Sequence, residues 1–127
     1  MSKITVIIPL FNKEKYITRA LSSVLKQTMQ DFEIIVVDDG STDRGAQKVR
    51  MMEDHRIKLM QQPNRGVSAA RNVGVQEAKT DIVAFLDADD EWTSEFLETI
   101  LHLRDVYPGA GLYATAYEIV SPNGKIS

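Results

Sequence analysis

Four apolar runs recur along the chain, and amphipathic segments separate them. Polar residues do not alternate with apolar ones inside these runs, a pattern typical of strands buried on both faces of a parallel sheet. The strands predicted in this way are Ile4–Ile8, Glu33–Val37, Arg56–Met60 and Asp81–Leu86.

The segments between the runs predict helices. In the first of them, Ile17, Leu21 and Val24 recur at helical spacing and form one apolar stripe. We expect Asn12 to cap this helix, and Ser41 or Thr42 to cap the second. The four predicted helices are Lys13–Gln27, Asp43–Asp54, Gly66–Ala78 and one from Thr93 or Ser94 to Val106.

A fifth strand is predicted at Leu112–Val120, followed by a hairpin turn at Pro122–Lys125. Strands that alternate with helices favour an α/β fold, with a mostly parallel sheet between two helical layers. Ligands of such sheets bind outside the carboxyl ends of the strands. The polar clusters of this sequence all follow a predicted strand, so we expect a ligand site at that edge.

Composition fits one ordinary globular domain, which we expect to span residues 1–127. Of the 127 residues, 43% are hydrophobic and 26% charged, and no linker-like segment divides them. The net charge of −3 and the scattered basic residues argue against a nucleic-acid partner. No apolar run is long enough to span a membrane, and the absence of cysteine fits a reducing, cytoplasmic location.

The stretch FLDADDEW places four carboxylates in five positions directly after a buried strand. Asp87 and Asp89 point the same way if the strand geometry continues, so they can converge on one cation. Mg²⁺ or Mn²⁺ held by one or two carboxylates completes its shell with water and substrate phosphates. For Asp90 and Glu91 we favour a structural role at the start of the following helix.

A second acidic pair, Asp38 and Asp39, follows the second strand in VVDDGSTD. Neither is needed as a helix cap or for the glycine turn, so a carboxylate here can accept hydrogen bonds from a base or a ribose. Arg65 and Arg71 lie near the same edge. The residues alone leave open whether they contact a ligand or solvent.

Taken together, ITVIIPLFNKEKYITRALSSVLKQT, DFEIIVVDDGSTD, PNRGVSAARNVGV and DIVAFLDADDEW resemble the donor-binding half of the family-two inverting glycosyltransferases. The resemblance implies a Rossmann-like GT-A fold that binds a nucleoside-diphosphate sugar, with UDP-sugars favoured. It places Pro9, Asp39 and Arg71 near the base and ribose, and Asp87 near the ribose or the phosphates. It makes Asp89 the ligand of Mg²⁺ or Mn²⁺.

The resemblance also implies activities and partners. Family members transfer the sugar to a saccharide or lipid-linked acceptor in surface polysaccharide synthesis, and their general base lies well downstream of the DxD motif. We therefore expect this chain to be the N-terminal part of a longer glycosyltransferase. By itself, without the general base, we expect it to bind donor without turning it over. We also expect the protein to self-associate. We further expect it to lie at the inner face of the membrane through regions outside this chain.

Two other classes of protein share parts of these motifs. Haloacid-dehalogenase phosphotransferases carry D-x-D on their first strand and Thr or Val where this chain has Glu91. A receiver-like Mg²⁺-binding domain requires a lysine at the end of strand five, where Ala116, Tyr117 and Glu118 stand. A non-catalytic nucleotide-binding or receiver-like domain is the alternative to a glycosyltransferase.

Overall fold

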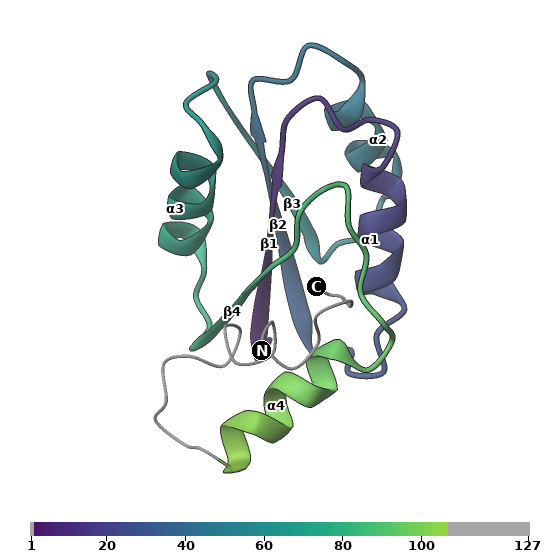
Figure 1. Cartoon of the computed structure of the whole chain (residues 1–127), viewed down its shortest axis with the longest axis vertical. Helices are drawn as coiled ribbons and strands as arrows, with labels where there is room; N and C mark the ends of the chain where they lie inside the picture. The colour runs from purple at the N-terminus through teal and green to yellow at the C-terminus, as the bar shows by residue number, and fades with distance from the viewer. Residues whose placement is uncertain (1, 107–127) are drawn as a thin grey trace.

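The computed structural model describes residues 2–106 and contains a four-stranded, fully parallel sheet. Its order is β3-β2-β1-β4 (Figure 1). The strands are β1 (Ile4–Leu10), β2 (Phe32–Asp39), β3 (Ile57–Gln62) and β4 (Ile82–Phe85). The predicted parallel sheet is confirmed; the predicted fifth strand and hairpin lie outside the described residues.

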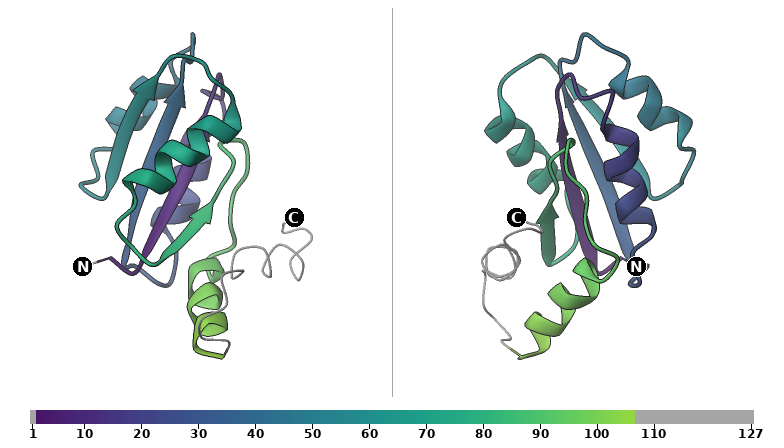
Figure 2. Two further views of the ribbon diagram at one scale, coloured as in Figure 1. Left: turned by 90° about the vertical axis from the view of Figure 1, so that its left-hand side faces the viewer. Right: turned by 45° about the vertical axis from the view of Figure 1, so that its right-hand side comes forward.

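Helices cover both faces of the sheet, so the predicted three-layer α/β/α arrangement is confirmed (Figures 1 and 2). Helices α1 (Ile17–Leu25) and α2 (Gly45–Met51) lie on one face, and α3 (Val67–Glu77) lies on the other. Helix α4 (Phe96–Val106) packs at the end of the layer that contains α1. No helix among residues 2–106 has the length and apolar character needed to cross a membrane.

The apolar runs of the sequence form the core because both faces of their strands are covered. On the α1 side, Ile4, Val6 and Ile8 are fully buried with Leu21 and Leu97. Removing such side chains from water is the main source of stability, about 1.5–3 kcal/mol for each.

Small residues bring α3 close to the other face. Ile35, Val37 and Ala70 are buried there. A methyl group built on Gly74 would lie 2.5 Å from Cγ2 of Ile7, so the helix can sit this near the sheet only with glycine at this position.

The predicted helix caps are wrong. Helix α1 begins at Ile17 without a side-chain cap. Asn12 instead has a φ of 51° and lies in the loop after β1. Its side-chain oxygen accepts a hydrogen bond from Thr42 N at 2.8 Å, so it joins two loops at the carboxyl edge of the sheet.

Helix α2 likewise begins later than predicted, at Gly45, and neither Ser41 nor Thr42 caps it. The Asp43 carboxylate accepts from Gly45 N at 3.0 Å and from Glu14 N at 3.0 Å, so it supports the start of α2 and the loop before α1.

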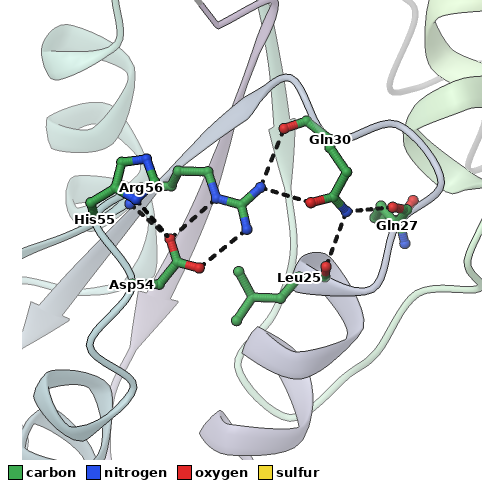
Figure 3. A network of polar contacts seen from close by, with 6 residues as sticks. All are labelled: Leu25, Gln27, Gln30, Asp54, His55 and Arg56. Atoms are coloured by element: carbon green, nitrogen blue, oxygen red, sulfur yellow. Dashed lines mark hydrogen bonds and ion pairs between the residues drawn. The ribbon is translucent and has the colours of Figure 1, made fainter.

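A polar network at the amino-terminal end of the sheet ties the start of β3 to the loop after α1 (Figure 3). Arg56 donates to both carboxylate oxygens of Asp54, at 3.1 Å each, and to Oε1 of Gln30 at 2.9 Å. Gln30 in turn donates to the main-chain oxygens of Leu25 and Gln27. The network lies at the edge opposite the polar clusters that follow the strands.

Candidate functional site

A cleft of about 430 Å³ opens at the carboxyl end of the sheet. It is built from the ends of β1, β2 and β4 and from the first turns of α3. All five residues that the sequence nominated for the donor and the metal line it, together with Lys13; the five are Pro9, Asp39, Arg71, Asp87 and Asp89.

A larger hollow of about 530 Å³ lies at the amino-terminal end, beside the network of Figure 3. Two of the basic side chains that line it are paired within the protein, Arg56 with Asp54 and Lys58 with Glu77. Because ligands of parallel α/β sheets bind at the carboxyl edge, we place the site in the smaller cleft.

Asp39 ends β2 and is only 3% exposed. Its Oδ1 accepts hydrogen bonds from Gln62 Nε2 at 2.9 Å and Arg65 N at 2.8 Å. Its Oδ2 accepts from Asn64 Nδ2 at 3.3 Å and Gly66 N at 2.9 Å. A carboxylate has about four acceptor sites, so Asp39 holds the loop after β3 against the cleft with all of them.

Burial of the Asp39 carboxylate raises its pKa, but the hydrogen bonds from Gln62, Arg65 N and Gly66 N outweigh that effect. The positive charge of Arg65 adds to them, and the pKa of Asp39 lies below its ordinary value. The carboxylate is therefore ionised at neutral pH and carries a fixed negative charge in the wall of the cleft.

The two loops that form this wall touch backbone to backbone. Gly40 has a φ of 79°, and a Cβ built on it would lie 2.7 Å from the main-chain nitrogen of Asn64. Neither the conformation nor the space admits a side chain, so the glycine sets how closely the loops after β2 and β3 approach.

Asp38 does not line the cleft, although the sequence gave it no structural role. It is 3% exposed, and its Oδ1 accepts from Ser41 N at 3.2 Å while Oδ2 accepts from Gln61 Nε2 at 3.2 Å. Its carboxylate stabilises the turn after β2 through Ser41 and contacts the neighbouring strand β3 through Gln61. The sequence does not reveal this second contact.

Asp87 and Asp89 both face the cleft, and both stay accessible. Their side chains are 58% and 45% exposed. Each is paired with a cation, Asp87 Oδ1 with Nη2 of Arg71 at 3.2 Å and Asp89 Oδ2 with Nζ of Lys13 at 3.2 Å. The structure thus places Arg71 in the cleft, an assignment that the sequence left open.

The sequence analysis missed Lys13 as a site residue. The signal was present, because Lys13 follows the first strand and so belongs to the same sheet edge as the other polar clusters. Its ion pair with a residue far along the chain becomes visible only in the folded structure.

Asp90 and Glu91 lie outside the cleft, as expected, but their predicted role at the start of a helix is wrong. Helix α4 begins only at Phe96, and the acidic residue of its first turn is Glu98. Asp90 accepts a hydrogen bond from the main-chain nitrogen of Glu91, whose carboxylate lies 3.6 Å from Nε of Arg19.

The carboxylates of Asp87 and Asp89 fit Mg²⁺ or Mn²⁺ shared with a ligand. Within residues 2–106 no group of three or more acidic, histidine or cysteine side chains could enclose a metal. Two accessible carboxylates beside an open cleft instead suit a hard dication that takes its other ligands from water and phosphate.

The sequence matches Glycosyl transferase family 2 over residues 5–125. It is 45% identical over 103 residues to the succinoglycan biosynthesis protein ExoW of Rhizobium meliloti, covering 76% of this chain and 32% of that protein. The chain belongs to Glycosyl transferase family 2.

Solved structures share the fold. The S. aureus TarS 1–349 complex with UDP-GlcNAc superposes with a TM-score of 0.77 at 37% identity, over 83% of this chain and 32% of that chain. The mannosyltransferase PcManGT of Pyrobaculum calidifontis, in complex with GDP-Man and Mn²⁺, superposes with a TM-score of 0.75 at 29% identity, over 80% of this chain and 32% of that chain. The Rossmann-like GT-A fold is confirmed, and the chain spans about a third of the length of these relatives.

Proposed function

We propose that this chain binds a nucleoside-diphosphate sugar, as the donor-binding part of a metal-dependent, inverting glycosyltransferase of polysaccharide synthesis. The observation that carries the proposal is the meeting of Asp39, Arg71, Asp87 and Asp89 in one cleft at the carboxyl end of the sheet. The TarS complex with UDP-GlcNAc and the PcManGT complex with GDP-Man and Mn²⁺ support it, since both have this fold. ExoW, named for succinoglycan biosynthesis, supports the pathway class.

Each residue has a role in this proposal. Pro9 and Asp39 bound the nucleoside end. The acceptor sites of Asp39 are filled within the protein, so an N–H or hydroxyl of the base or ribose takes the place of the longest of these bonds, that from Asn64 Nδ2 at 3.3 Å. Arg71 lies near the base, with a side chain long enough for its guanidinium to reach the phosphates, and Asp87 faces the ribose or the phosphates. Asp89 holds Mg²⁺ or Mn²⁺, which when bound stabilises the negative charge of the leaving nucleoside diphosphate.

We assign no general base within residues 2–106. Inverting transfer requires a carboxylate or another base that takes the proton of the acceptor hydroxyl, and the cleft carboxylates already serve the donor. The saccharide or lipid-linked acceptor, the single-domain assignment, the cytoplasmic location and self-association stay predictions from the sequence.

Thermal unfolding of the 127-residue chain with UDP or GDP, with and without Mn²⁺, tests the proposal. A ligand at 100 times its Kd stabilises the folded state by about 2.7 kcal/mol, so we expect a higher Tm with nucleotide and a further rise with Mn²⁺. Asp89→Asn removes the proposed metal ligand and should abolish the Mn²⁺-dependent part.

Asp90→Asn is the matched control, because it makes the same change of charge one residue away and outside the cleft. Its Tm should rise with nucleotide and Mn²⁺ as in the wild type. The proposal is wrong if neither nucleotide raises the Tm, or if Asp89→Asn responds to Mn²⁺ as the control does.

A further inference from the structure

Both accessible carboxylates of the cleft are occupied by cations of the chain itself. Lys13 comes from the loop after β1 and Arg71 from α3, and each lies 3.2 Å from its carboxylate oxygen. These pairs balance the charge of Asp87 and Asp89, two acids that would otherwise repel each other at the end of β4.

Lys13 disfavours a dication at Asp89 while it stays at Oδ2 of that carboxylate. Mg²⁺ and Mn²⁺ bind carboxylate oxygens directly, and the ammonium of Lys13 would then face a divalent charge at close range. The two cations therefore compete for Asp89. Lys13 is 41% exposed on a flexible stem, so its ammonium can move within the cleft at little cost.

The Asp89 loop does not depend on Lys13 for its position. Arg19, from α1, donates from Nη2 to the main-chain oxygen of Asp89 at 2.8 Å. The carboxylate therefore stays at the cleft when Lys13 moves away, ready to take another cation.

The second cation is also incompletely bonded where it lies. Nε of Arg71 is buried and has no hydrogen-bond partner. A buried N–H without an acceptor is unfavourable, so the position of this guanidinium in the ligand-free protein does not satisfy all its donors. A phosphate in the cleft supplies acceptor oxygens to a guanidinium that shifts toward it.

We propose that Lys13 and Arg71 hold Asp89 and Asp87 in the ligand-free protein and exchange them for diphosphate oxygens when the metal binds. The inference rests on the donor-binding function proposed above. Metal and diphosphate then help each other, because the metal frees the cations that bind phosphate, and the phosphate draws away the cations that compete with the metal. By linkage, the coupling is the same in both directions.

The exchange predicts effects of opposite sign in one variant, Lys13→Gln. Without the competing ammonium, Mn²⁺ alone should bind about two- to fivefold more tightly, the scale of an exposed ion pair. UDP with saturating Mn²⁺ should bind about tenfold more weakly, because a charged donor to the phosphate is lost. Lys15→Gln is the control, since it removes the same charge from an exposed side chain outside the cleft.

Electron paramagnetic resonance of free Mn²⁺ measures the first affinity on the full 127-residue chain, and calorimetry with UDP in Mn²⁺ measures the second. Unchanged or weaker Mn²⁺ binding by Lys13→Gln, or UDP binding equal to that of Lys15→Gln, overturns the exchange. If the wild type binds neither UDP nor GDP in any condition, the donor-binding function fails instead, so the two failures are distinguishable.

Discussion

At the scale of single residues, Asp39 is the most heavily bonded polar group of the site. One backbone N–H approaches each of its oxygens, that of Arg65 at Oδ1 and that of Gly66 at Oδ2. An asparagine at position 39 can offer an oxygen to only one of them. Whichever way its amide is turned, its NH₂ group faces one of these two backbone N–H groups, which cannot move to another acceptor.

We therefore expect Asp39→Asn to lower the free energy of unfolding by about 1–3 kcal/mol, the cost of an unsatisfied buried donor. Asp38→Asn is the matched control. Its oxygens accept from Ser41 N and from the side-chain amide of Gln61. Gln61 can turn and present its oxygen, because the bond given up, from Nη2 of Arg50, is exposed to solvent. Urea unfolding should show a clearly smaller loss for position 38, and equal losses would refute the argument.

At the scale of elements, one buried glutamine attaches α4 to the rest of the fold. Gln27 is 2% exposed, and its Oε1 accepts from Leu97 N at 2.9 Å, in the first turn of α4. Its Nε2 donates to the main-chain oxygens of Ser23 and Thr93, at 3.0 and 2.6 Å. Two of these three bonds, those with Leu97 and Thr93, join α4 and the segment before it to the end of α1.

Gln27→Leu should loosen α4, because it leaves the buried N–H of Leu97 without a partner, while the carbonyl of Thr93 keeps only its bond from Phe96 N. The expected loss is about 1–3 kcal/mol. Trp92 is the single tryptophan of the chain and stacks on Phe96, with ring centroids 3.9 Å apart. Its fluorescence should shift to longer wavelength as α4 loosens, whereas an unchanged spectrum and stability would contradict this role.

The sequence predicted the elements better than their ends. Buried β-branched runs such as Ile4–Ile8 identify strands because both faces are covered, a property that each run carries by itself. Asn12 had the residue type of a cap, yet its side chain bonds to Thr42 in another loop. Which partner such a side chain selects depends on the tertiary fold, so no local pattern predicts it.

The same reason explains what was found of the site. The rule that parallel strands end at a common edge brought together the polar clusters after the strands, which contain Pro9, Asp39, Asp87 and Asp89. The resemblance to the family singled out Pro9 and Asp39 within these clusters and added Arg71 from a helix. The hydrogen bonds that saturate Asp39 and the pairing of Lys13 with Asp89 join segments distant in the chain. These contacts exist only after folding, and the residue types alone do not determine them.

At the scale of the whole molecule, acidity should act on both ends of the sheet. Hydrogen bonds and the positive charge of Arg56 lower the pKa of Asp54 at the amino-terminal end. Burial raises the pKa of Asp39 at the carboxyl end, but its hydrogen bonds outweigh burial and the pKa is lowered there too. Since both are depressed in the folded state, both carboxylates contribute stability above their ordinary value of 3.8.

That stability is lost as pH falls from about 3.8 through the lower pKa values of the folded state. These two groups should therefore leave the urea concentration at the unfolding midpoint unchanged between pH 7 and pH 5, and should lower it steeply near pH 3. Asp39→Asn should show a smaller fall over the same range, because one of the two titrating groups is gone. A variant with the wild-type pH profile would show that Asp39 does not contribute to it.

The contact between Gly40 and Asn64 also limits how donor preference can be redesigned. A single carbon atom added at Gly40 would push the loop after β3 outward, so main-chain atoms, and not a replaceable side chain, set the spacing of the two loops beside the cleft. Libraries that aim to change which donor the cleft accepts should keep this glycine, and also Gln62 and Asn64, whose amides donate to Asp39. They should vary Phe11 and Val67, exposed apolar residues that line the cleft.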